Sequence, residues 1–212
     1  MNRPRLLIGV LGTHTEVGKT WVSSRLLAHA RAQGLRVAAR KPVQSYDTNP
    51  IVTDAQQLAE STGEPITVVC PEHRCYPLAL APPMAADLLK RPRILLQDIV
   101  DEIQWPAGVD IGLVETVGGL LSPLAHDGDS VDLITRLQPD RIVLVADAGL
   151  GTLNAVRLSL ACLAPLTATV MLNRFDAGNE LHRLNRAWLT EKYAANVVTT
   201  IEELAAQVLA VR

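Results

Sequence analysis

The residues with the clearest chemical pattern lie in one segment near the start of the chain, residues 12–20, which reads Gly-Thr-His-Thr-Glu-Val-Gly-Lys-Thr. An apolar run precedes this segment and a helix-compatible stretch follows it, which is the context of a phosphate-binding loop. Gly18 lets the backbone turn closely around phosphate oxygens, and the first amides of the following helix attract an anion. Lys19 can neutralise the β- and γ-phosphates of a nucleotide, and the Thr20 hydroxyl can coordinate Mg²⁺. The segment therefore predicts a nucleotide site.

The loop departs from the usual pattern G-x-x-x-x-G-K-[ST] at one position. That pattern places its first glycine at Thr13, whereas this chain has glycine one residue earlier, at Gly12. The alternative interpretation is a glycine-rich turn between a strand and a helix, in which Lys19 is incidental. The flanking elements favour the phosphate loop.

Two charged residues follow apolar runs and are candidates for the same site, because ligands of a parallel sheet gather at the carboxyl ends of its strands. Lys41 follows the second run, where a cation can span a γ-phosphate and a second anion in line with it. Its alternative role is that of an ordinary solvated lysine. Glu115 closes the apolar run 111–114 in the manner of a Walker-B acid, and Mg²⁺ requires such an oxygen ligand.

Two further features each allow a functional and a structural interpretation. Asp54 begins a predicted helix behind Thr53, so it is either a metal ligand or an acid that complements the helix dipole. Gly118 and Gly119 follow Glu115 closely and either present backbone amides to an anion or make a tight turn. The sequence leaves both questions open.

The elements that must position these residues alternate between short apolar runs and helix-length amphipathic segments, which is typical of repeated βαβ units. The strands are expected at residues 6–11, 37–39, 111–114, 142–146 and 169–172. The helices are expected at residues 20–33, 54–61, 95–103, 131–137, 154–163 and 180–193. Right-handed crossovers predict an α/β fold like that of P-loop NTPases, with a mostly parallel sheet and helices on both faces. Prolines interrupt the pattern between residues 65 and 92, where we expect irregular structure.

Length and composition narrow the class of protein. The chain has 212 residues without a linker-like segment, which predicts one domain over residues 1–212. Its formal net charge of -2 disfavours binding to nucleic acid or to an anionic membrane surface. Cys70, Cys75 and Cys162 form no CxxC pair, and the first apolar run is too short for a signal peptide or a membrane span. We therefore expect a cytoplasmic protein.

Five segments in register together resemble dethiobiotin synthetase, and their order and spacing match through about three quarters of the chain. They are residues 15–20, residues 41–45, residues 54–55, residues 114–115 with 118–121, and residues 150–154. The resemblance implies a step of biotin biosynthesis, in which ATP and Mg²⁺ drive ring closure of 7,8-diaminopelargonate with CO₂. In that scheme an amine becomes a carbamate, the carbamate takes the γ-phosphoryl group, and the second amine displaces phosphate. Catalysis then depends on positioning and charge neutralisation.

The resemblance also implies roles for individual residues. Lys19, Lys41 and Thr15 would be catalytic, and Thr20, Asp54 and Glu115 would hold Mg²⁺. The nucleotide would contact Glu16, Val17, Gly18, Lys19, Thr20 and Asn173, with the Asn173 amide reading the base. The diamine or carbamate would contact Thr15, Lys41, Ser45, Gly118, Leu150, Gly151 and Asn154. We expect a symmetric homodimer in which residues 150–154 complete the partner's site; the alternative for Asn154 is an ordinary helix N-cap.

Several positions depart from the family pattern. Tyr46 stands where glycine usually follows the serine, and His14 replaces the usual aspartate of the loop. Thr116 and Val117 are β-branched at positions where the backbone approaches the ligand, which predicts a narrower carbamate pocket. Residues 197–203 lack the family's proline-containing loop around the base, so the sequence leaves the choice of nucleotide open.

Two alternative functions remain compatible with the pattern. One is a related amidoligase or amine-carboxylating enzyme with a different substrate. The other is a P-loop ATPase that acts as a switch on a protein partner. That class usually carries a further Lys or Arg early in its loop, whereas residues 12–18 of this loop contain neither.

Overall fold

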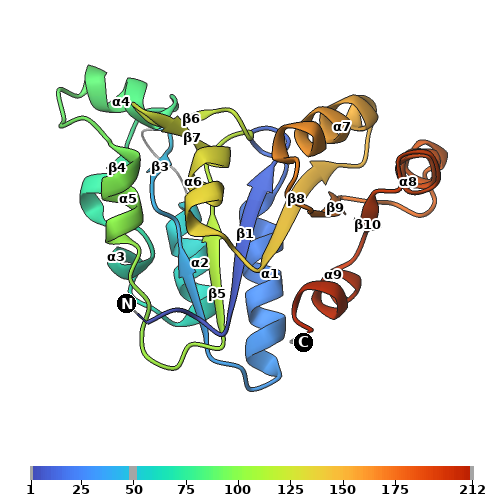
Figure 1. Ribbon diagram of the computed structural model, residues 1–212, viewed down its shortest axis with the longest axis horizontal. Helices are drawn as coiled ribbons and strands as arrows, with labels where there is room; N and C mark the ends of the chain where they lie inside the picture. Colours follow the sequence, from blue (N-terminus) through green and yellow to red (C-terminus); the bar gives the residue numbers. More distant parts are fainter. Residues whose placement is uncertain (1, 48–51, 211–212) are drawn as a thin grey trace.

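The computed structural model describes residues 2–47 and 52–210 and centres on a six-stranded sheet with the order β10-β9-β8-β1-β5-β2 (Figure 1). Every neighbouring pair in this sheet is parallel, which confirms the predicted α/β class. Its strands are β1 (Leu6–Gly12), β2 (Val37–Arg40), β5 (Ile111–Glu115), β8 (Arg141–Asp147), β9 (Thr169–Asn173) and β10 (Asn196–Val198).

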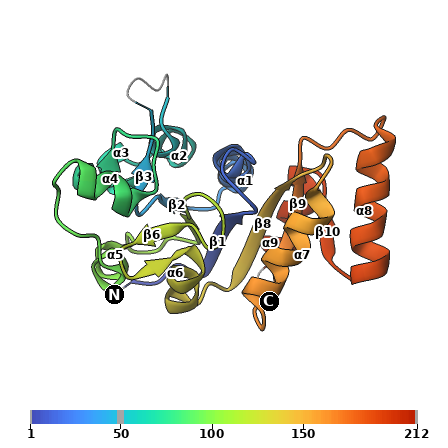
Figure 2. The same ribbon diagram turned by 90° about the horizontal axis from the view of Figure 1, so that it is seen from above.

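The helices pack on both faces of the sheet, as predicted. They are α1 (Lys19–Ala32), α2 (Asp54–Thr62), α3 (Ile66–Val69), α4 (Pro82–Leu88), α5 (Leu96–Glu102), α6 (Ser130–Leu137), α7 (Thr152–Leu163), α8 (Glu180–Tyr193) and α9 (Ile201–Val208). In Figure 2, α1 and α2 lie on one side of the sheet, and α5 and α6 lie on the other. Side chains of a strand alternate between the faces. Accordingly Ile8 and Val10 of β1 join the core beneath α1, while Leu7 and Leu11 join the two cores on the opposite face.

The segment from residue 65 to 92 is more ordered than predicted. It contains α3, a 3₁₀ turn η1 (Glu72–Arg74), the strand β4 (Cys75–Tyr76) and α4. The expectation of irregular structure was wrong because prolines occupy places where helices tolerate them: Pro65 is the N-cap of α3, and Pro82 is the first residue of α4. Strand β4 pairs in parallel with β3 (Gln44–Ser45) to make a small second sheet.

Two elements near the C-terminus were not predicted. Strand β10 has three residues and extends the sheet at its edge, where it pairs with β9. Helix α9 begins after Thr200, whose hydroxyl accepts a hydrogen bond from the Glu203 amide. A strand this short has too few residues for an alternating pattern to emerge from the sequence.

Strand register gathers the predicted polar residues at one edge of the sheet. Arg40 pairs with Val114 in the β2–β5 ladder, so the next residues, Lys41 and Glu115, emerge side by side. Glu115 in turn pairs with Val10 of β1, two residues before the phosphate loop begins. A small antiparallel hairpin, β6 (Pro123–Ala125) with β7 (Gly128–Asp129), follows β5. Within the described part of the chain, no helix has the length and apolar character needed to cross a membrane.

Candidate active site

The phosphate loop connects β1 to α1, and its shape depends on glycine. Gly18 is the N-cap of α1 and has φ 91°, a left-handed conformation that favours glycine. A Cβ atom here would also collide with the Asn173 side-chain amide. That amide donates a hydrogen bond to the Val17 carbonyl over 2.8 Å, and the Val17 side chain is fully buried. The loop is therefore held from β9 as well as from its own ends.

Lys19 extends from the first position of α1 across the loop. Its Nζ atom donates to the carbonyl oxygen of Gly118 over 2.9 Å and to that of His14 over 3.5 Å. Burial, followed by the nearby charge of Lys41, lowers the pKa of Lys19 to about 8. An anion bound at the loop would favour the charged form of this lysine.

Lys41 lies between two carboxylates, and the interpretation of it as a solvated lysine is wrong. The side chain is only 1% exposed, and Nζ lies 2.8 Å from Asp54 Oδ2 and 2.8 Å from Glu115 Oε1. It also donates to the Thr116 carbonyl over 3.1 Å. Burial alone would lower the pKa of Lys41, but the charges of Asp54 and Glu115 outweigh it and raise that pKa. The same attraction, chiefly from Lys41, lowers the pKa of Asp54.

Hydroxyl groups of α1 complete this cluster. Thr20 Oγ1 lies 2.8 Å from Asp54 Oδ1 and 2.7 Å from Glu115 Oε1, and Ser23 donates to Glu115 Oε2 over 2.7 Å. Ser23 was not predicted, although it lies one helical turn after Thr20, on the same face of α1. Glu115 is fully buried, whereas the Asp54 side chain is 43% exposed. Thr53 is the N-cap of α2, so the Asp54 carboxylate is not needed as a cap and instead bonds Thr20 and Lys41.

A cleft of about 830 Å³ adjoins this cluster, and the fully buried Glu115 is not among the described residues that line it. Thr15, Lys19, Thr20, Lys41, Ser45, Asp54 and Gly118, predicted from distant parts of the sequence, all line it. Gln57, Ser122, Pro123 and Arg174 line it as well and were not predicted. Such a cleft, lined by two lysines and by a carboxylate beside a hydroxyl, can hold a phosphate chain next to a second anion.

The departures from the family pattern affect this cleft unequally. Thr116 is 1% exposed and its hydroxyl donates to the Val10 carbonyl over 3.2 Å, so it does not narrow the cleft and that expectation was wrong. Val117 and Tyr46 do line the cleft.

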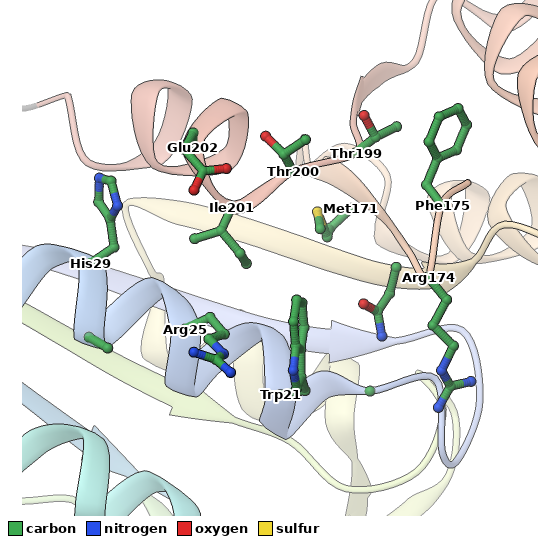
Figure 3. A pocket seen from close by; sticks show the side chains of 13 residues that line it. Trp21, Arg25, His29, Met171, Arg174, Phe175, Thr199, Thr200, Ile201 and Glu202 are labelled. Atoms are coloured by element: carbon green, nitrogen blue, oxygen red, sulfur yellow. The ribbon is translucent and has the colours of Figure 1, made fainter. Parts of the chain in front are cut away.

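A second cavity of about 730 Å³ adjoins the phosphate loop, and Gly18 lines both spaces. Figure 3 shows Trp21, Arg25 and His29 of α1 facing the segment Thr199 to Glu202, with Arg174 and Phe175 at one end. Asn173 also lines this cavity. The aromatic and basic face of α1 was missed, although its residues recur every fourth position, as one face of a helix does. A flat, hydrogen-bonding group next to a bound phosphate chain fits these walls.

Residues 150–154 lie outside the cleft of the single chain. Leu150 is 92% exposed and Gly151 is the N-cap of α7, in a left-handed conformation. Asn154 is the third residue of that helix, so its interpretation as an N-cap was wrong. None of Leu150, Gly151 and Asn154 is among the described residues that line the cleft.

The parallel sheet, with its glycine-lysine-threonine loop between β1 and α1, defines a P-loop α/β protein. A sequence-family model described as an AAA domain matches residues 7–206. Solved structures of the signal recognition particle receptor FtsY share the fold. The receptor from Elizabethkingia anophelis has a TM-score of 0.53 and 18% identity, over 96% of this chain and 62% of that one. The chain thus spans about three fifths of that receptor. The protein from Thermotoga maritima has a TM-score of 0.53 and 15% identity, over 99% of this chain and 70% of that one.

Curated relatives specify the family within this class. An ATP-dependent dethiobiotin synthetase BioD from Phenylobacterium zucineum is 37% identical over 171 residues, which cover 76% of this chain and 71% of the relative. The protein of the same name from Rhodococcus jostii is 38% identical over 159 residues, 74% of this chain and 68% of the relative. The chain belongs to the family of ATP-dependent dethiobiotin synthetases.

Proposed function

We propose that this protein uses ATP to form dethiobiotin from 7,8-diaminopelargonate and CO₂, a step of biotin biosynthesis. Family membership supports the reaction, and one observation carries the assignment of the site. Lys19 and Lys41 approach the same cleft from two different elements, beside the carboxylates and the Thr20 hydroxyl. Cations in two such positions can neutralise both a phosphoryl group in transfer and the second anion that receives it.

The proposed route needs no nucleophile from the protein. One amine takes up CO₂ to give a carbamate, whose oxygen attacks the γ-phosphorus as ADP departs; the second amine then attacks the carbamoyl carbon and expels phosphate. Lys19 stabilises the phosphate chain, and Lys41 stabilises the carbamate and the group in transfer. Thr15, Ser45 and Gly118 line the cleft where the diamine lies. Tyr46 and Val117 limit the space around it.

The donor set of the cluster fits Mg²⁺. Two carboxylates and one hydroxyl converge within hydrogen-bond distance, and Mg²⁺ favours such oxygen ligands together with phosphate and water. Thr20, Asp54 and Glu115 would hold the ion, which when bound neutralises charge on the phosphates. Ser23 and Lys41 orient Glu115 by hydrogen bonds.

The test is to mix the protein with ATP, Mg²⁺, bicarbonate and 7,8-diaminopelargonate and to look for dethiobiotin by mass spectrometry. We expect one phosphate released for each dethiobiotin formed. Phosphate release that depends on the diamine but yields no dethiobiotin would favour an amine-carboxylating enzyme of different specificity. Phosphate release that does not depend on the diamine would favour an ATPase switch.

Removing one charge from the proposed metal site is expected to raise the Mg²⁺ requirement. For both Asp54→Asn and Glu115→Gln we expect the Mg²⁺ concentration for half-maximal turnover to rise about tenfold or more, because an amide oxygen is a poorer ligand for a hard cation. Asp98→Asn, on the opposite face of the sheet, is the matched control. Titration curves that coincide with the wild type would remove the metal role from both acids.

The hydrogen bonding of Asn173 leads to an expected nucleotide preference. Its Nδ2 atom is engaged with Val17, which leaves the side-chain oxygen as an acceptor in a side chain only 5% exposed. On the major-groove edge, adenine and cytosine carry an exocyclic amine that can donate to it, whereas guanine and uracil carry a carbonyl group at the corresponding position. We expect ATP and CTP to bind about tenfold more tightly than GTP and UTP by calorimetry, since an unpaired buried acceptor is costly.

The control for this preference is a variant of the same cavity. Trp21→Leu is expected to weaken all four nucleotides similarly, because an aromatic face contacts any base. Asn173→Ala is expected to reduce the difference between them. A wild-type protein that binds all four nucleotides equally would contradict the role of Asn173.

The position of residues 150–154 leads us to propose a homodimer that shares its sites. Leu150, Gly151 and Asn154 are exposed and lie outside the cleft of their own chain, so the carboxylate tail of the diamine would meet them across a two-fold interface. We expect Lys19→Ala and Asn154→Ala proteins to be nearly inactive separately and to regain activity when their subunits exchange. Each heterodimer then contains one intact site. Heterodimers seen by sedimentation without recovered activity would contradict a shared site.

A further inference from the structure

Cys70 and Cys75 lie against each other beside the cleft, outside the proposed mechanism. Cys70 follows α3 and Cys75 begins β4, and their sulfur atoms are 3.5 Å apart. Both thiols are also close to the Pro71 carbonyl oxygen, at 3.8 Å and 3.5 Å. Cys70 is 2% exposed, whereas Cys75 is half-buried. The third cysteine, Cys162, is exposed on α7.

The two thiols differ in acidity: the pKa of Cys75 is lowered and that of Cys70 is raised. The hydrogen bond with Cys70 lowers the pKa of Cys75 to about 6; Gln44 and Arg91 act in the same direction, while burial and Glu72 oppose them. The same hydrogen bond, together with burial, raises the pKa of Cys70. The half-buried Cys75 is therefore the more acidic thiol of the two, and the buried Cys70 the less acidic one. A thiolate that is accessible and next to a resolving cysteine is typical of a redox-sensitive site.

We propose that Cys70 and Cys75 form a reversible redox site, which hydroperoxides convert into an intramolecular disulfide. The Cys75 thiolate attacks one peroxide oxygen, the O–O bond breaks, and the departing hydroxide takes up a proton as water. Cys75 is then a sulfenic acid. Cys70 loses its proton and attacks the Cys75 sulfur, which releases the second hydroxide as water. Two thiols are thereby oxidised and one hydrogen peroxide is reduced to two waters; a dithiol reductant reverses the change by exchange.

The redox pair is connected to the cleft through Gln44. The Gln44 side chain donates to the Cys75 sulfur over 3.2 Å and accepts from the Ala55 amide over 3.1 Å. Gln44 precedes Ser45 on β3 and pairs with Cys75 across the small sheet, and Ala55 follows Asp54. A disulfide sulfur is a poorer hydrogen-bond acceptor than a thiolate. Oxidation therefore weakens the link that Gln44 of β3 makes between β4 and α2. We expect oxidised protein to use the diamine less efficiently, and this expectation rests on the proposed function.

The test maps the bond directly in the full chain, so its result does not depend on the proposed function. Protein treated with hydrogen peroxide is alkylated and cleaved after Arg74, which separates the two cysteines unless a disulfide joins them. We expect a linked peptide that contains Cys70 and Cys75, with Cys162 alkylated, and full recovery of three thiols after dithiothreitol. The Cys162→Ser variant should form the same link.

Two variants resolve the order of events. Cys75→Ser should leave Cys70 reduced under the same treatment. Cys70→Ala should form no link and should oxidise at Cys75 more slowly, to sulfenic and then sulfinic acid, because the hydrogen bond that lowers the Cys75 pKa is lost. Recovery of both cysteines in alkylated form from oxidised wild type would overturn the proposal. Oxidation of wild-type Cys75 to sulfinic acid without a bond to Cys70 would overturn it equally.

Discussion

Replacing Lys41 with methionine is expected to reduce turnover by about 100- to 1000-fold, the usual effect of losing one electrostatic stabiliser of a transition state. The same change is expected to destabilise the folded protein, because the fully buried Glu115 carboxyl group would lose the ion-pair partner that now lies 2.8 Å away. Breaking a buried ion pair by removing one partner costs on the order of 3 kcal/mol.

Thermal unfolding with and without Mg²⁺ measures the second effect. A divalent cation can restore positive charge between Asp54 and Glu115, so Mg²⁺ should raise the melting temperature of Lys41→Met more than that of the wild type. Lys90→Met, which removes an exposed lysine, is the control and should change neither stability nor turnover. A Lys41→Met protein with wild-type stability and unaltered response to Mg²⁺ would contradict the role of Lys41 between the carboxylates.

Replacing Lys19 with alanine is expected to reduce turnover by a similar factor. Unlike Lys41→Met, it is not expected to destabilise the folded protein. In the proposed mechanism Lys19 contacts the phosphate chain in every nucleotide-bound state. We therefore expect its loss to weaken ATP binding, whereas Lys41→Met should change ATP affinity much less. Stability should be unchanged or slightly higher, because burial disfavours the charged lysine: its folded-state pKa is about 8, against 10.5 for the free side chain.

The sign of that shift defines a pH window for the comparison. Below pH 8 Lys19 is charged in both the folded and the unfolded protein, so the folded protein carries the full free-energy cost of burying the charge. Between pH 8 and 10.5 only the folded protein has released the proton, and this cost falls to zero as the pH rises. Any stability advantage of Lys19→Ala should therefore be largest near neutral pH and vanish near pH 10.5. Calorimetry that finds equal ATP affinities for Lys19→Ala and Lys41→Met would contradict the division of roles.

Local patterns in the sequence were sufficient for the class of fold and for the phosphate loop. A run of buried aliphatic residues, a glycine turn and a helix start are each encoded within a few consecutive residues, so β1, the loop and α1 were predictable. The same holds for Glu115 at the end of its strand. Short elements such as β4 and β10 were missed, because they depend on pairing with a neighbouring strand rather than on a pattern of their own.

Only the tertiary structure decided where Lys41 lies and which groups it contacts. Its sequence context allows a solvated lysine, but the parallel register of β2 and β5 places it beside Glu115, and α2 adds Asp54 from the other side. The thiol pair has the same origin, since α3 and β4 bring Cys70 and Cys75 together within a segment that the sequence left irregular. Such contacts arise from strand register and helix packing between separate elements, and the ionisation of each group follows from the partners that the fold supplies.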